Sequence, residues 1–165
     1  MKAVLFDLGG TLENEGTLLP GAVEMLEAIR RLRDVDGVVA MGLVSDFYMP
    51  KIPAELPGIR QSYLAILERL GIGRFFEPSD RCVTLSSEVG VFKPDERVFR
   101  VALDRLDLGL PFTDALFVTE NFDHVSAAGA LGMRAIHFKG PGQVTGDVGY
   151  LPDLVPLVEA FVAEK

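Results

Sequence analysis

Four reactive side chains stand at or shortly after the ends of short apolar runs: Asp7, Ser45, Lys93 and Glu120. A carboxylate such as Asp7 can attack phosphorus and form an aspartyl-phosphate. A hydroxyl and an ammonium, here Ser45 and Lys93, can hold phosphoryl oxygens as negative charge builds on them. The four residue types together indicate phosphoryl-transfer chemistry, provided that the fold brings them to one place.

Such chemistry brings two anions together, so a cation has to offset their repulsion. Mg²⁺ binds through one or two carboxylates together with backbone oxygen and water. Asp7, the Gly9 carbonyl and Glu120 could supply such a ligand set. Gly10 and Thr11 would turn the chain so that backbone N–H groups face the anion.

Hydrophobic periodicity predicts the elements that position these residues. Apolar runs typical of buried strands cover residues 2–8, 37–45, 81–86, 115–120 and 133–138. Segments with helical spacing cover 20–33, 59–70, 93–106 and 124–132, and a last helix falls within 151–165, where Pro156 is expected to restrict it to its later part. A glycine-rich loop over 140–149 precedes that helix.

Strands that alternate with helices predict right-handed βαβ units and a parallel sheet covered on both faces. We therefore expect an α/β fold: a three-layer α/β/α sandwich on a Rossmann-like, mainly parallel sheet of about five strands. Residues 1–165 are expected to form a single domain. Ligands of such sheets bind beyond the carboxyl ends of the strands. Asp7, Ser45 and Glu120 fall at those ends, and Lys93 can reach the same crevice.

Composition narrows the classes of partner. The chain has 165 residues, 48% of them hydrophobic, and a net charge of −8. That charge argues against a nucleic-acid partner or an anionic membrane surface. No apolar run reaches the ~18 residues of a membrane helix, and no signal-peptide pattern opens the chain. A cytoplasmic location is therefore expected. The single cysteine, Cys82, is predicted to be a buried thiol.

Four segments, in this order, resemble the motifs of the haloacid dehalogenase (HAD) superfamily. They are VLFDLGGTL (4–12), MGLVSD (41–46), SSEVGVFKPDERVF (86–99) and ALFVTENFDHVSAAGALGMRAIHF (115–138). The third, with its E-V-G-x-x-K-P pattern, is the most specific, and the resemblance covers nearly the whole chain.

The resemblance implies a Mg²⁺-dependent phosphatase that works through an aspartyl-phosphate. Asp7 would be the nucleophile and Thr11 its support. Ser45 and Lys93 would bind phosphate, and Asp7 and Glu120 would bind the metal.

One departure from the superfamily pattern concerns the acid/base step. Gly9 stands where phosphatases of the superfamily carry a second aspartate, which protonates the leaving group and then activates water. A positioned acid/base contributes roughly 10²–10⁴ in rate, which corresponds to about 3–5 kcal/mol of barrier. Some members with glycine here are nonetheless phosphatases. Good leaving groups, such as acyl or aryl phosphates, would not need the proton.

Two further departures lie in the metal loop. The Gly-Asp of the superfamily reads Thr119-Glu120 here. Glutamate keeps the charge but reaches farther, so Mg²⁺ is expected at a shifted position. The next acid of the loop aligns with His124, while Asp123 lies one position earlier. We expect Asp123 among the metal-site residues, with His124 as the alternative.

The cap module that covers the substrate in many relatives is not expected in this chain. Residues 12–20 suffice only for a hairpin-sized flap, and one helix and one strand use most of 46–92. An open site suits a phosphorylated small molecule, a larger phosphorylated substrate, or a homo-oligomer in which the partner subunit supplies a lid.

Two other functions stay open from the sequence. A degenerate relative would use the fold as a binding or regulatory module, with neither metal binding nor turnover. A dehalogenase also lacks the second aspartate, but its cap supplies halide-binding groups for which this chain has no room.

Overall fold

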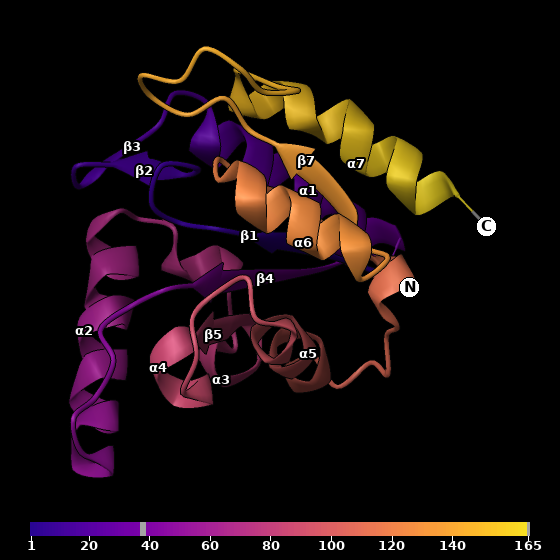
Figure 1. Cartoon of the computed structure of the whole chain (residues 1–165). Coiled ribbons are helices and arrows are strands. Elements are labelled where there is room, and N and C mark those ends of the chain that lie inside the picture. Colours follow the sequence, from indigo (N-terminus) through magenta and orange to yellow (C-terminus); the bar gives the residue numbers. More distant parts are fainter. Residues whose placement is uncertain (37–38, 165) are drawn as a thin grey trace.

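A parallel sheet forms the centre of the structure. The computed structural model describes residues 1–36 and 39–164. Within them, five parallel strands pair in the order β5-β4-β1-β6-β7 (Figure 1). Their bounds are β1 (Lys2–Phe6), β4 (Val39–Ser45), β5 (Val83–Leu85), β6 (Ala115–Thr119) and β7 (Arg134–His137). The predicted three-layer α/β class with a mainly parallel sheet is confirmed.

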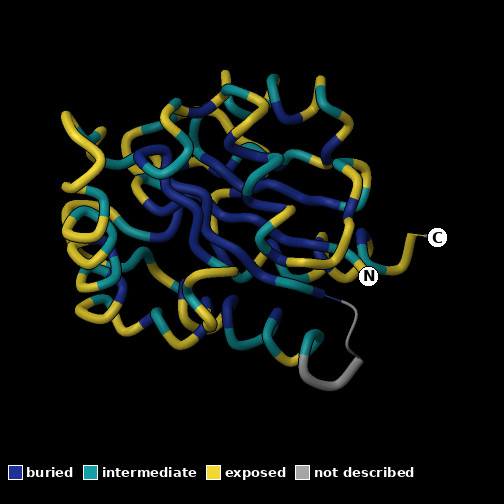
Figure 2. Tube along the Cα trace, turned by 90° about the horizontal axis from the view of Figure 1, so that it is seen from below, coloured by how far each residue is buried: buried dark blue, intermediate teal, exposed yellow. Residues whose placement is uncertain are grey.

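Helices cover both faces of this sheet. On one face α1 (Ala22–Asp36) and α7 (Leu154–Ala163) pack on side chains that include Val4 and Phe6. On the other face α5 (Glu96–Arg105) and α6 (Phe122–Ala130) pack on Ala3 and Leu5. Successive strand residues point to opposite faces, so strands buried on both sides have the continuous apolar runs seen in the sequence. Figure 2 shows the strands buried along most of their length.

The remaining elements lie around the ends of the strands. They are the hairpin of β2 (Glu13–Asn14) and β3 (Thr17–Leu18), the helices α2 (Leu56–Arg69), α3 (Ser79–Cys82) and α4 (Ser86–Val89), and 3₁₀ turns at Pro53–Glu55, Gly73–Phe75, Phe112–Asp114 and Leu151–Asp153. The hairpin and α2 both lie toward the end at which β1 and β4 stop (Figure 1). None of the helices in the described part of the chain is long and apolar enough to cross a membrane.

Proline and capping residues shift several boundaries from their predicted positions. The helix predicted over 59–70 begins at Leu56, because Pro57 fits the first turn, where its missing N–H leaves no bond unmade. The last helix was expected to be restricted to the part after Pro156, but it begins at Leu154 with Pro156 in its first turn. α6 begins at Phe122 because the Asn121 side chain caps it.

The strand predicted over 81–86 is shorter than expected. The backbone amides of Arg81 and Cys82 both bond to the Pro78 carbonyl, which closes a helical turn before the strand begins at Val83. Cys82 is half-buried and packs against both cores. Of the strand predicted over 37–45, residues 37–38 lie outside the described residues, as does residue 165 of the last helix.

Candidate active site

One cavity at the carboxyl ends of the strands is lined by four of the predicted site residues, Asp7, Ser45, Lys93 and Glu120. Its volume is about 530 Å³. Its walls are formed by Asp7, Leu8, Gly9, Glu13, Gly16, Ser45, Asp46, Phe47, Tyr63, Ile66, Arg69, Lys93, Glu120, Asn121 and His124. The cavity lies beyond the central strand β1 and its neighbours β4 and β6. The connection after β1 runs to α1 on one face of the sheet and the connection after β6 runs to α6 on the other face, and ligands of such folds bind at a point of this kind.

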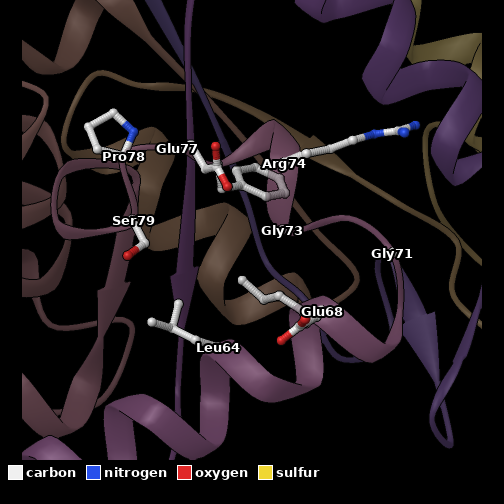
Figure 3. A pocket seen from close by; sticks show the side chains of 10 residues that line it. Leu64, Glu68, Gly71, Gly73, Arg74, Glu77, Pro78 and Ser79 are labelled. Atoms are coloured by element: carbon white, nitrogen blue, oxygen red, sulfur yellow. The ribbon is translucent and has the colours of Figure 1, made fainter.

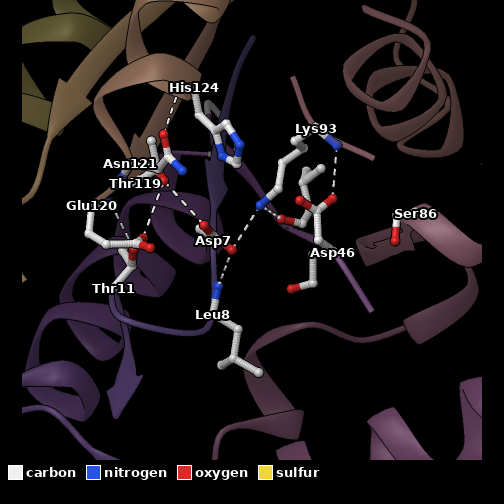
Figure 4. Close-up of polar contacts among 12 residues, drawn as sticks. Asp7, Leu8, Thr11, Asp46, Ser86, Lys93, Thr119, Glu120, Asn121 and His124 are labelled. Atoms are coloured by element: carbon white, nitrogen blue, oxygen red, sulfur yellow. Dashed lines mark hydrogen bonds and ion pairs between the residues drawn. The ribbon is translucent and has the colours of Figure 1, made fainter. Parts of the chain in front are cut away.

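Asp7 lies directly after β1 and is held through both of its carboxylate oxygens. Oδ1 accepts the Leu8 backbone N–H at 2.9 Å and pairs with Lys93 Nζ at 2.8 Å. Oδ2 accepts from the Thr119 hydroxyl at 3.1 Å. Figure 4 shows Asp7 between Lys93 on one side and the Thr119 and Glu120 side chains on the other. These contacts fix the direction in which the carboxylate faces the cavity.

Lys93 is buried, with an exposed fraction of 5%. Besides Asp7, its ammonium contacts the Val44 carbonyl at 2.8 Å. Its backbone N–H donates to Asp46 Oδ1, also at 2.8 Å. Asp46 therefore positions the lysine loop, and Val44 positions the ammonium beside the nucleophile. A buried ammonium with one carboxylate partner can hold an incoming phosphoryl oxygen.

Glu120 forms the second anionic group of the site. The Thr11 hydroxyl donates to its Oε2 at 2.7 Å and accepts its backbone N–H at 3.1 Å. The Thr119 hydroxyl lies 3.3 Å from the same oxygen, so it stands between the two carboxylates. Burial, and then the charge of Asp7, raise the pKa of the Glu120 carboxyl, against the lowering effects of Thr11 and Lys93. The site thus has an excess of negative charge that a cation would relieve.

The site offers two carboxylates to a metal, and this number is enough for Mg²⁺. Within the described residues, no three or more His, Cys, Asp or Glu side chains are grouped closely enough to hold a metal by themselves. Mg²⁺ does not need such a cage, because it keeps several waters and is commonly bound by one or two carboxylates. Asp7 and Glu120 could supply those two, and Gly9 lines the same cavity.

The structure does not bring Asp123 to this cavity. Asp123 lines a neighbouring hollow with Phe122 and His137, whereas His124 lines the cavity of Asp7. Burial, and then the nearby Lys93, lower the pKa of His124. Its Nδ1 is enclosed and forms no hydrogen bond within the described residues. Of the two residues considered for the metal site, His124 is the one beside Asp7.

Ser45 forms a hydrogen bond with a partner that the sequence did not indicate. At the end of β4, its hydroxyl bonds to the hydroxyl of Tyr63 from α2. Tyr63 is 1% exposed. Its pKa is raised by burial and by the charges of Asp7 and Glu13, although the bond to Ser45 lowers it. The phenol therefore stays protonated and fixes the Ser45 hydroxyl at the cavity wall.

Gly10 permits the close approach of the nucleophile loop to Glu120. Its φ is +74°, in the left-handed region that favours glycine. A Cβ at this position would lie 2.9 Å from the Glu120 side chain. A larger residue at position 10 would thus displace the carboxylate of Glu120.

A larger hollow, of about 810 Å³, lies elsewhere on the molecule (Figure 3). It lies between α2 and the turn at 73–79, and its lining includes Leu64, Glu68, Arg74 and Glu77. None of the residues predicted to do chemistry lines it, so the smaller cavity around Asp7 is the candidate active site.

Comparison with known proteins supports the fold. No family model matches the chain. In solved structures, an HAD phosphatase from Thermococcus onnurineus superposes with a TM-score of 0.71 over 96% of this chain and 98% of its own, at 17% identity. The chain has the HAD-like fold. L-2-haloacid dehalogenase from Xanthobacter autotrophicus gives a TM-score of 0.65 over 97% and 99% of the two chains, at 16% identity.

Sequence relatives match only part of the chain. It is 34% identical over 67 residues to (S)-2-haloacid dehalogenase 1 of Pseudomonas sp. strain CBS-3, covering 41% of this chain and 28% of that protein. It is 41% identical over 59 residues to drimenol cyclase drtB of Aspergillus calidoustus, covering 36% and 11%. The chain thus spans less than a third of the length of these two relatives.

Proposed function

We propose that this protein is a Mg²⁺-dependent phosphatase that forms an aspartyl-phosphate on Asp7. The observation that carries the proposal is the carboxylate of Asp7, held by the Leu8 N–H and Lys93 at the end of the central strand, with Glu120 beside it. One solved structure with this fold is named an HAD phosphatase. The substrate is a phosphorylated small molecule, or a larger phosphorylated substrate that reaches the open cavity.

Each residue of the proposed site has its own role in phosphoryl transfer. Asp7 attacks phosphorus through a carboxylate oxygen, and the leaving oxygen departs on the opposite side. Lys93 and the Ser45 hydroxyl hold the phosphoryl oxygens as charge builds on them. Asp7 and Glu120, with the Gly9 carbonyl, would hold Mg²⁺, which when bound supplies the positive charge that offsets repulsion between nucleophile and substrate.

The proposal is tested by a phosphatase screen that includes acyl, aryl and alkyl phosphates, with and without Mg²⁺. We expect turnover that requires Mg²⁺ and is lost in Asp7→Asn. Because one sequence relative is a haloacid dehalogenase, the same preparations are assayed for chloride release from 2-chloropropionate. Chloride release without phosphate release would identify a dehalogenase. No turnover and no metal binding would identify a degenerate binding module.

Glu120→Gln is expected to stabilise the metal-free protein and to abolish its stabilisation by Mg²⁺. Glutamine can still accept from the Thr11 hydroxyl but removes a half-buried negative charge beside Asp7. At a Mg²⁺ concentration about 100 times its Kd, the wild type should gain ~2.7 kcal/mol of stability. Thermal unfolding across a Mg²⁺ titration measures both effects.

Glu159→Gln, on the exposed side of α7, is the matched control for this experiment. It removes the same charge far from the cavity and should keep the wild-type response to Mg²⁺. An equal Mg²⁺ response in Glu120→Gln would show that Glu120 is not a ligand.

A further inference from the structure

The space beside Gly9 is where the missing acid/base would extend, and the carboxyl group of Glu13 already lies there. A Cβ built on Gly9 would lie 3.6 Å from Glu13 Oε1. Apart from Gly9 and its chain neighbours, no other heavy atom of the described residues lies within 4 Å of that position. An aspartate at position 9 would therefore place its side chain against the carboxyl of Glu13.

The hairpin fixes Glu13 to the nucleophile loop. The Glu13 backbone N–H donates to the Leu8 carbonyl at 3.1 Å, and the Glu13 carbonyl accepts from Gly10 at 2.8 Å. The side chain is oriented as well, because Oε2 accepts the Gly16 backbone N–H at 2.9 Å. Gly16 closes the turn with a φ of +80°. With Oε2 tied to the turn, Oε1 is the oxygen on the side of Gly9.

Glu13 also faces the reacting groups. Its side chain lines the cavity that Asp7, Ser45 and Lys93 line. Tyr63 lines this cavity too, and the charges of Asp7 and Glu13 both raise the pKa of its hydroxyl. Glu13 is half-buried, so its carboxyl has access to water as well as to the cavity.

Two other titratable groups of the cavity are placed less well to transfer a proton at the position of the absent aspartate. The Tyr63 hydroxyl is buried and engaged with Ser45. His124 lies beside Lys93 (Figure 4), and its Nδ1 is enclosed by protein. Neither side chain has an atom within 4 Å of the position that a Cβ on Gly9 would take.

We propose that Glu13 is the general acid and base of the phosphatase reaction, in place of the absent aspartate at position 9. This rests on the proposed function. As Asp7 attacks phosphorus, the bond from phosphorus to the ester oxygen breaks, and that oxygen takes the proton of the Glu13 carboxyl to leave as an alcohol. The Glu13 carboxylate then takes a proton from the water that attacks the aspartyl-phosphate. The bond from phosphorus to the Asp7 oxygen breaks, which releases inorganic phosphate and restores Asp7.

This assignment extends the substrate class to alkyl phosphate monoesters, whose poor leaving groups need a proton. Glu13→Gln should lower kcat for an alkyl phosphate such as glycerol 3-phosphate by at least roughly 10²-fold. With 4-nitrophenyl phosphate the leaving group needs no proton, so Asp7 should still be phosphorylated. Only its hydrolysis should be slowed, and we expect a burst of 4-nitrophenolate followed by a slow steady state.

Glu15→Gln is the matched control, because Glu15 lies in the same turn but is exposed and does not line the cavity. It should retain wild-type turnover of both esters. Gly9→Asp in the Glu13→Gln background should restore alkyl turnover at least in part. Gly9 is not in the left-handed region, and its added Cβ makes only ordinary van der Waals contact, so the residue fits.

The outcomes separate this assignment from the proposed function. A burst in Glu13→Gln with loss of alkyl turnover would support both. Wild-type hydrolysis that is unchanged in Glu13→Gln, or lowered equally for both esters without a burst, would overturn the role of Glu13 alone. A wild type that hydrolyses neither ester would overturn the proposed function and with it the assignment. If Glu13→Gln fails to fold by circular dichroism, Glu13→Asp takes its place, and unchanged kinetics in that shorter variant would overturn the assignment.

Discussion

Replacing Asp7 with asparagine is expected to abolish phosphoenzyme formation and to lower kcat by roughly 10⁴-fold or more, the scale on which loss of a nucleophile acts in other covalent enzymes. An amide is nearly the same size as the carboxylate and can still accept from the Leu8 N–H. It lacks the negative charge that attacks phosphorus and pairs with Lys93 at 2.8 Å. Acid-quenched samples treated with hydroxylamine, which cleaves acyl phosphates, would report the intermediate directly.

The control for this substitution is Asp153→Asn. Asp153 is exposed before α7, and its side chain forms no hydrogen bond to the helix end. It should show wild-type turnover and a wild-type level of phosphoenzyme. If Asp7→Asn retained turnover, the assignment of Asp7 as the nucleophile would be wrong. If the wild type released phosphate without forming an acyl phosphate, water would attack the substrate directly.

The sequence was enough to predict that four residues lie in one cavity, namely Asp7, Ser45, Lys93 and Glu120. Each residue follows an apolar run, and parallel strands present their carboxyl ends at one edge of a sheet. The topology alone therefore brings residues far apart in the chain, such as Asp7 and Glu120, into one cavity. No knowledge of side-chain contacts was needed for this step.

Glu13 and Tyr63 could not be assigned in this way. Tyr63 lies on the buried side of α2, and only the placement of α2 near the end of β4 turns its hydroxyl to Ser45. Glu13 stands in a short flap whose direction depends on the left-handed turn at Glu15 and Gly16. Side chains presented by elements outside the sheet depend on tertiary docking, which periodicity does not encode.

Whether Asp123 or His124 reaches the site depends on where the helix that carries them begins. Successive helix residues point about 100° apart, so a small change in register turns a different side chain to the site. The helix was expected from 124 onward, but the Asn121 cap starts it at Phe122. As a result His124 faces Asp7, and Asp123 faces the neighbouring hollow. Caps of short helices are the points at which sequence-based site assignments are least secure.

Lys93→Met is expected to lower kcat by roughly 10³–10⁵-fold, the range over which a cation that stabilises the transferring phosphoryl group acts. It should also destabilise the protein by about 3–5 kcal/mol, because it leaves the buried Asp7 carboxylate without its ion-pair partner. The side chains of Lys93 and Asp7 are 1% and 12% exposed, so water can replace the lost ammonium only in part. Methionine is close in length to lysine, which limits any cavity that the substitution creates.

A double variant tests whether the stability lost in Lys93→Met comes from leaving Asp7 unpaired. In Asp7→Asn with Lys93→Met, neither charge is left buried alone, so urea unfolding should show recovery of much of the stability that Lys93→Met loses. Activity should stay absent, because the nucleophile is gone. Additive losses of stability would mean that the two side chains are not coupled, in contradiction to their 2.8 Å contact. Recovery of stability would show that the ion pair offsets the cost of burying the charge of the nucleophile.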